Sequence, residues 1–85
     1  MPHYVYLARC SDGSLYTGTC VDTAARQARH NEGKGSKYTR SRLPVTIVYQ
    51  EQCATLSQAR RREAQVKALR KAQKEGLIAD RAREK

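Results

Sequence analysis

Two short segments near the start of the chain are rich in aromatic and β-branched residues, which is the pattern of β-strands. They cover residues 4–10 (YVYLARC) and 15–18 (LYTG), and residues 11–14 (SDGS) between them form a strong turn signal. Two strands joined by so short a turn pair antiparallel, so the pattern predicts a β-hairpin.

The length of this turn decides which side chains share a face of the sheet. A two-residue loop would place Tyr6 and Tyr16 on opposite faces, because side chains alternate along a strand. A three-residue loop with Gly13 in the left-handed conformation would pair Tyr6 with Gly18 and place both tyrosines on one face. The sequence permits both loops, and only the second allows the tyrosines to form a site.

A helix and a third strand follow the hairpin. Asp22 or Thr23 can cap a helix that runs to about His30, and residues 34–42 (KGSKYTRSR) are expected to form a basic, flexible loop. Residues 45–49 (VTIVY) are almost unbroken in apolar character, which favours a well-covered strand in the centre of a sheet.

The last part of the chain has the periodicity of a helix. Ser57 is expected to cap a long helix that extends to about Lys74, with Gly76 separating a short final turn or helix. The resulting order β-β-α-β-α predicts an α+β fold with a small antiparallel sheet. The 85 residues contain neither a repeat nor a linker, so we expect one domain over residues 1–85.

Composition and charge narrow the range of functions. The net charge is +9 and the isoelectric point about 10.0, which favours a polyanionic partner, above all nucleic acid. Three cysteines without a CxxC spacing argue against a disulfide scaffold and a common zinc knuckle. The chain has neither a signal-peptide pattern nor an apolar run long enough to cross a bilayer. We therefore expect a cytoplasmic protein without a membrane partner, present as a monomer or a weak homodimer.

Glu63 is the one acidic residue within residues 58–74 (QARRREAQVKALRKAQK). One interpretation is a solvated helix on which Glu63 pairs with Lys67 one turn later. The other interpretation is that Glu63 binds a cation, because helical geometry places it at the border of the core-facing stripe, where an ionised carboxylate needs a positive partner.

The first predicted helix carries a second candidate group. Arg26 and His30 are four residues apart and therefore lie on one helix face, with Arg29 adjacent. An arginine is suited to gripping a phosphate through its planar fork, and a histidine can bind a phosphate or relay a proton. The alternative for these residues is ordinary surface charge.

Further basic residues could hold a nucleic-acid backbone. Tyr38 among them could stack on an unpaired base, or it could pack within its own loop. The expected nucleic-acid contacts are Arg29, Lys34, Lys37, Tyr38, Arg40, Arg42, Arg60, Lys67, Lys71 and Lys74.

The candidate residues occur in the order and spacing of one known family. Residues 4–6 (YVY) and 16–18 (YTG) resemble the paired signature of the GIY-YIG nuclease superfamily. Arg26 follows where that family carries its phosphate-gripping arginine, and His30 where it carries histidine or tyrosine. Glu63 matches its metal-binding glutamate. The similarity extends over nearly the whole chain and is greatest to the small, stand-alone single-domain branch.

This resemblance implies a GIY-YIG fold, a three-stranded antiparallel sheet flanked by helices, and a metal-dependent endonuclease that hydrolyses phosphodiester bonds. Glu63 would hold one divalent cation, Mg²⁺ or Mn²⁺, and Arg26 would stabilise the phosphate. Tyr6 or Tyr16 would activate water, with assistance from His30. The substrate would be DNA, single-stranded or branched, or RNA. The alternative is a nucleic-acid-binding module of the same fold that does not cut.

The first helix departs from the family pattern. Thr23 and Gln27 stand where relatives usually have leucines. We therefore expect a loosely packed or shifted helix, on which Arg29 could replace Arg26 as the phosphate ligand.

Overall fold

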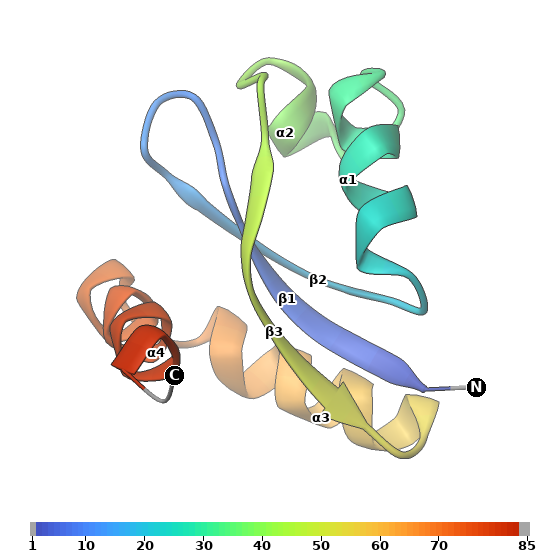
Figure 1. Ribbon diagram of the computed structural model, residues 1–85, viewed down its shortest axis with the longest axis vertical. Helices are drawn as coiled ribbons and strands as arrows, with labels where there is room; N and C mark the ends of the chain where they lie inside the picture. Colours follow the sequence, from blue (N-terminus) through green and yellow to red (C-terminus); the bar gives the residue numbers. More distant parts are fainter. Residues whose placement is uncertain (1, 84–85) are drawn as a thin grey trace.

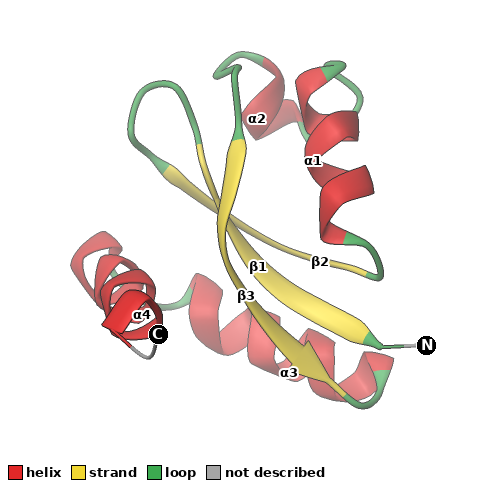
Figure 2. Cartoon of the chain, in the orientation of Figure 1, coloured by secondary structure: helices red, strands yellow, loops and turns green. Residues whose placement is uncertain are grey.

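The computed structural model describes residues 2–83 and contains a three-stranded antiparallel sheet in the order β2-β1-β3, flanked by helices (Figures 1 and 2). The elements are β1 (His3–Arg9), β2 (Leu15–Cys20), α1 (Thr23–Asn31), α2 (Lys37–Arg40), β3 (Thr46–Cys53), α3 (Leu56–Lys67) and α4 (Lys71–Arg83). The predicted α+β class and antiparallel sheet are confirmed.

The hairpin has the three-residue loop. The Cys10 amide donates to the Ser14 carbonyl at 2.9 Å, and Gly13 has φ +84°, which glycine adopts without strain. Tyr6 therefore pairs with Gly18, and Tyr16 pairs with Ala8, two residues after Tyr6 on β1. Because side chains alternate along a strand, Tyr6 and Tyr16 lie on the same face of the sheet.

The two faces of the sheet have separate apolar clusters. On one face, Val5 and Leu7 pack against Ala59 and Val66 of α3. The other face carries the cluster of Tyr6, Ala8, Cys10, Cys20 and Val45, and α1 and α2 lie on this side. Figure 1 shows α1 and α2 well separated from α3 and α4, with the sheet between them. Each fully buried Leu or Val contributes about 1.5–3 kcal/mol, so these small clusters provide most of the apolar stabilisation.

The predicted central position of the third strand is wrong. β1 is central, with Val5 to Ala8 fully buried, and β3 is an edge strand. The apolar residues 45–49 are buried on both faces of the sheet. Val45 belongs to the cluster on the α1 side, and Tyr49 belongs to the cluster beneath α3. Alternate packing on two faces, rather than a central place in the sheet, accounts for the run.

Side chains of α1 bind part of the free edge of β3. The Gln27 Oε1 atom accepts from the Ile47 amide at 2.7 Å. Asn31 donates to the Val45 carbonyl at 2.9 Å and accepts from the Val45 amide at 2.7 Å. A leucine at position 27 could not make this bond, so the polar residue anchors the helix, contrary to the expected loose packing. Asp22 caps the helix by accepting from the Ala25 amide at 3.0 Å.

The single long helix predicted for residues 57–74 is also wrong. Thr55, rather than Ser57, caps α3, and the helix ends at Lys67; α4 then begins at Lys71 and contains Gly76 in its interior. The break lets Leu77 and Ile78 fold back onto the α3-side cluster. An uninterrupted helix would carry these residues away from the sheet.

Two ion pairs secure these C-terminal helices. Arg9 at the end of β1 binds Glu75 of α4 through both guanidinium nitrogens, at 2.8 and 2.7 Å. Arg62 of α3 binds Glu51 of β3 in the same bidentate way, at 2.8 and 2.9 Å. Among residues 2–83, we find no helix with the length and apolar character needed to cross a membrane.

Candidate active site

A chain of buried hydrogen bonds links the hairpin to α1 and α2. The Tyr6 hydroxyl lies 2.8 Å from His30 Nε2, and His30 Nδ1 lies 3.0 Å from the Thr39 hydroxyl. The three residues are 0%, 1% and 0% exposed. The predicted flexible loop thus contains a short helix, α2, whose Thr39 reaches the site.

Two glycines make room for this chain. A Cβ atom at Gly18 would lie 2.6 Å from the Tyr6 hydroxyl oxygen, and one at Gly35 would lie 2.0 Å from His30 Nδ1. Real Cβ atoms essentially never approach other heavy atoms within 3.0 Å. Any other residue at these positions would displace Tyr6 or His30.

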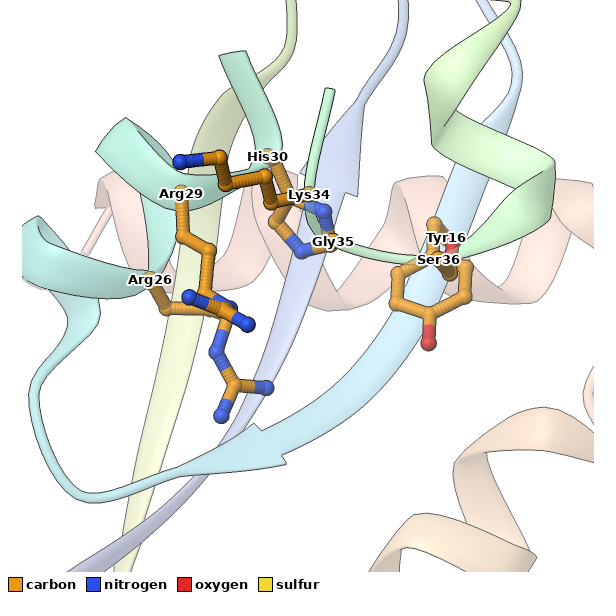
Figure 3. A pocket seen from close by; sticks show the side chains of 7 residues that line it. All are labelled: Tyr16, Arg26, Arg29, His30, Lys34, Gly35 and Ser36. Carbon is orange, nitrogen blue, oxygen red and sulfur yellow. The ribbon is translucent and has the colours of Figure 1, made fainter. Parts of the chain in front are cut away.

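A basic pocket of about 250 Å³ opens beside this chain, lined by Tyr16, Arg26, Arg29, His30, Lys34, Gly35 and Ser36 (Figure 3). In Figure 3, the side chains of Arg26, Arg29 and Lys34 gather on one side of the pocket and Tyr16 stands apart from them. Arg26 is fixed by donating to the Thr19 carbonyl of β2 at 3.0 Å. Three cations without an acidic lining residue form a site suited to an anion such as a phosphate.

The same arginine sets the electrostatics behind the pocket wall. Burial raises the pKa of Tyr6 to about 12, although a hydrogen bond from Arg26 opposes this shift. Burial and the positive charge of Arg26 lower the pKa of His30 below its usual value. His30 is therefore a neutral imidazole at pH 7, able to donate through one nitrogen and accept through the other.

Tyr16 has a different environment from Tyr6. It is half-buried on the pocket wall, with its ring centroid 5.5 Å from that of His30. Tyr38 stacks on it at 6.1 Å, and the Arg42 guanidinium carbon lies 3.9 Å from the centre of the Tyr38 ring. Tyr38 thus packs within the protein while remaining 39% exposed. Its stacking on an unpaired base stays a prediction.

Glu63 is the catalytic candidate that lies apart from this pocket. It belongs to α3, on the opposite face of the sheet, and its side chain is 22% exposed. Its carboxylate lies 3.6 Å from Lys67 Nζ, the ion pair of the simpler interpretation. Tyr6, Tyr16, Arg26 and His30, in contrast, are brought together around the pocket.

Helical geometry nevertheless directs Glu63 toward the edge strand that carries Tyr16. Relative to the buried Ala59, Arg62 points about 60° to one side of α3 and Glu63 about 40° to the other. Arg62 binds Glu51 of β3, so Glu63 faces the opposite edge, β2. Arg26 binds the same strand from the other face of the sheet, through the Thr19 carbonyl.

The residues present fit a lightly coordinated hard cation. Within residues 2–83, no group of three His, Cys, Asp or Glu side chains could form a metal cage. Mg²⁺ needs no such cage, because it commonly retains water and binds through one or two carboxylates plus substrate phosphates. The half-buried Glu63 carboxylate can serve as such a ligand.

The remaining basic candidates differ in their surroundings. Lys34 lines the pocket, whereas Arg42 pairs with Asp12 and Lys71 with Glu75. Burial, followed by the charge of Lys67, lowers the pKa of Lys74. Of the basic candidates outside the pocket, Lys37, Arg40 and Arg60 are exposed and form no ion pair with another described side chain.

Sequence reasoning missed Thr39, Ser36 and Gly35, and it named Gly18 within the YTG triplet without predicting that Gly18 makes room for Tyr6. The signal for Thr39 was its spacing from Ser36, because Ser-x-x-Thr can form a reciprocal capping box. The structure contains this box at the start of α2. The burial of Thr39 against His30 depends on the tertiary fold.

Fold and pocket together define a basic α+β domain with a pocket lined by tyrosine and arginine. Residues 2–76 match the family model of the GIY-YIG catalytic domain, and the chain belongs to this family, a nuclease superfamily. It is 49% identical over 79 residues to the UPF0213 protein SH2523 of Staphylococcus haemolyticus, covering 93% of this chain and 96% of that one.

Two solved structures are also similar. The solution NMR structure of the UPF0213 protein BH0048 from Bacillus halodurans is 43% identical, with a TM-score of 0.59 over 93% of this chain and 84% of that one. That of EF2693 from E. faecalis is 38% identical, with a TM-score of 0.63 over 94% and 85% of the two chains. The names of these relatives specify no reaction.

Proposed function

We propose that this protein is a metal-dependent endonuclease that hydrolyses phosphodiester bonds in DNA, with unpaired or branched DNA as the substrate. The observation that carries the proposal is the buried Tyr6–His30 hydrogen bond beside a pocket lined by Arg26, Arg29 and Lys34. A binding surface would need the cations alone. A buried phenol–imidazole pair next to them supplies a route for a proton.

The three cations hold the scissile phosphate. Arg26 is tethered to the Thr19 carbonyl, so its guanidinium is already oriented and loses little freedom on binding. Arg29 and Lys34 add positive charge from the same side of the pocket. Charge that builds on the phosphate oxygens during hydrolysis is stabilised where these donors converge.

The two tyrosines have separate tasks. Tyr16 stands on the pocket wall, where its hydroxyl orients the attacking water. Tyr6 is fully buried and bonded to a neutral His30, so once a water reaches it behind the pocket wall, its phenol can accept a proton as it gives its own to the imidazole. This coupled transfer is needed because a pKa of about 12 disfavours a free phenolate at Tyr6.

Glu63 would hold the divalent cation, Mg²⁺ or Mn²⁺, from the β2 side of α3. An ion held there would neutralise charge on the phosphate and its leaving oxygen where the substrate crosses the β2 edge of the sheet. Arg60 and Lys67 lie about 60° and 40° from Glu63 around the helix, on the same flank, and would bind neighbouring phosphates. Lys67 currently pairs with Glu63 at 3.6 Å, a weak contact that a divalent cation can replace.

The test is cleavage by Glu63→Ala with Mg²⁺ or Mn²⁺ on single-stranded, duplex and branched DNA and on RNA. We expect cleavage to be abolished while nucleic-acid affinity stays unchanged or rises, because a negative charge is removed. Losing the exposed pair with Lys67 should cost only about 0.5 kcal/mol of stability. Glu32→Ala, the same change on an exposed surface, is the matched control and should cut normally.

Two results would redirect the proposal. If the wild-type protein binds nucleic acid but cuts none of these substrates with either metal, it is a binding module. If Glu63→Ala cuts as well as the wild type, the metal ligand is assigned wrongly. The Glu63–Lys67 ion pair is the observation that favours the binding module, because it leaves the carboxylate partly neutralised.

A further inference from the structure

Thr39 is fully buried and lies behind the pocket. It is 0% exposed, and its hydroxyl is 3.0 Å from His30 Nδ1, on the side of the ring opposite to Tyr6. A threonine hydroxyl has one proton to donate and can accept further bonds. The direction of its hydrogen bond to His30 therefore determines which ring nitrogen carries the proton.

Ser36 binds the Thr39 hydroxyl from several directions. The Thr39 hydroxyl donates to the Ser36 carbonyl at 3.2 Å and accepts from the Ser36 amide at 3.3 Å. The Thr39 amide in turn donates to the Ser36 hydroxyl at 3.1 Å, which completes the capping box of α2. With its own proton directed to Ser36, the Thr39 hydroxyl is left to accept from His30 Nδ1–H.

The proton positions then follow around the ring. A neutral His30 with its proton on Nδ1 has a bare Nε2, which accepts from the Tyr6 hydroxyl at 2.8 Å. In the opposite tautomer, Nε2–H would donate to the Tyr6 oxygen, and the phenol proton would have no acceptor among the hydrogen bonds of the described residues.

We infer that Thr39 is a positioning residue that fixes His30 as the Nδ1–H tautomer, leaving Nε2 free to take the proton of Tyr6. This role rests on the proposed nuclease function, since it matters only if Tyr6 transfers a proton. Gly35 supports it by allowing the backbone to pass close to His30 Nδ1. The segment from Gly35 to Thr39 thus holds the His30 imidazole in one position and one tautomer.

The tautomer can be measured without substrate or metal. Burial and the charge of Arg26 lower the pKa of His30, so the ring is neutral at pH 7.5. Long-range ¹H–¹⁵N NMR then distinguishes Nδ1–H from Nε2–H, and a His3→Gln background leaves His30 as the sole histidine. We expect Nδ1–H. An Nε2–H signal in this folded protein would overturn the inference without any change at Thr39.

Variants at position 39 test the causal role. Thr39→Val keeps the shape but removes the hydroxyl, whereas Thr39→Ser keeps the hydroxyl. We expect Thr39→Val to shift the tautomer population toward Nε2–H and to lower kcat about 10- to 100-fold with KM unchanged, because general acid–base catalysis contributes about 10²–10⁴-fold. Thr39→Ser should retain both the tautomer and kcat within about threefold.

The outcomes separate this inference from the proposed function. If Thr39→Val keeps the wild-type tautomer, Thr39 only packs. If Thr39→Val loses kcat while Thr39→Ser loses it equally, the hydroxyl is not responsible. If the wild type shows Nδ1–H but cuts nothing, the nuclease proposal fails while the hydrogen-bond assignment holds. Should Thr39→Val not fold, the wild-type spectrum and Thr39→Ser still decide.

Discussion

Gly35→Ala adds a single methyl group and should disable the candidate site, although Gly35 is not one of the proposed catalytic residues. The added methyl carbon would lie 2.0 Å from His30 Nδ1 and 2.7 Å from Cε1. The backbone of Gly35 lies outside the left-handed region, so alanine itself is permitted there. His30 is 1% exposed, and both of its ring nitrogens are held by hydrogen bonds, to Tyr6 and to Thr39. Relief of the overlap therefore requires the imidazole or the Gly35 segment to shift.

The cost can be worked from this geometry. Overpacking a close-packed site costs about 1–3 kcal/mol. Moving His30 also weakens its bonds to Tyr6 and Thr39, each worth about 1 kcal/mol. Replacing glycine by alanine also stabilises the protein by about 0.4–1 kcal/mol, because it lowers the conformational entropy of the unfolded chain. The net loss is about 2–4 kcal/mol, a large part of the roughly 4–13 kcal/mol expected for 85 residues.

The assay compares urea unfolding and cleavage with those of Gly33→Ala. Gly33 has φ +78°, so alanine there is strained by about 1–2 kcal/mol, yet its Cβ would meet only Arg40 Cγ at 3.8 Å. Both variants should be less stable, but only Gly35→Ala should lose cleavage when measured well below its unfolding transition. A Gly35→Ala protein within about 0.5 kcal/mol of the wild type would refute the packing argument.

The remaining two predictions concern stability. Among the described residues, the Thr17 hydroxyl is the one buried side-chain polar atom without a hydrogen-bond partner. Thr17→Val should therefore stabilise the fold by about 1 kcal/mol in urea unfolding and leave cleavage unchanged. A destabilised variant would indicate that the hydroxyl has a partner. Arg9 and Lys71 lower the pKa of Glu75 from 4.5 to about 2, so its contribution is complete above about pH 4.5 and lost as the pH falls toward 2. Because the Glu75 side chain is 35% exposed, we expect Glu75→Gln to cost only about 0.5–1 kcal/mol at pH 6, a difference that should vanish near pH 2; a pH-independent difference would contradict the ion-pair account.

The local parts of the fold were predictable because each depended on neighbouring residues. The SDGS turn offered two loop lengths, and the one with Gly13 left-handed is present. Asp22 caps α1, as its place before an alanine-rich segment indicated. The grouping of Tyr6, Tyr16, Arg26 and His30 around one pocket was also predictable, because the family resemblance depends on spacing along the chain.

The features that were not predicted depend on contacts between distant segments. An apolar run does not reveal strand order, and β3 lies at the edge because α1 covers part of it with Gln27 and Asn31. The break before α4 is favoured by burial of Leu77 and Ile78, whose partners are on the sheet. Thr39 sits in a basic, polar stretch, and its burial results from a histidine nine residues earlier.

Glu63 is a negative charge on a surface that is otherwise suited to binding a polyanion, and its presence there needs a reason. A carboxylate among cations repels a polyanion, so a surface used only to bind nucleic acid gains nothing from it. Lys67 partly neutralises Glu63, and that pairing also offsets the repulsion between Lys67 and the nearby Lys74. This structural benefit is small, because exposed pairs one helical turn apart contribute only about 0.3–0.5 kcal/mol. A positive residue at position 63 would strengthen binding to a polyanion, and a neutral one would serve the helix nearly as well. The carboxylate therefore supports the proposed cation site, in which a divalent ion would take the place of the Lys67 ammonium.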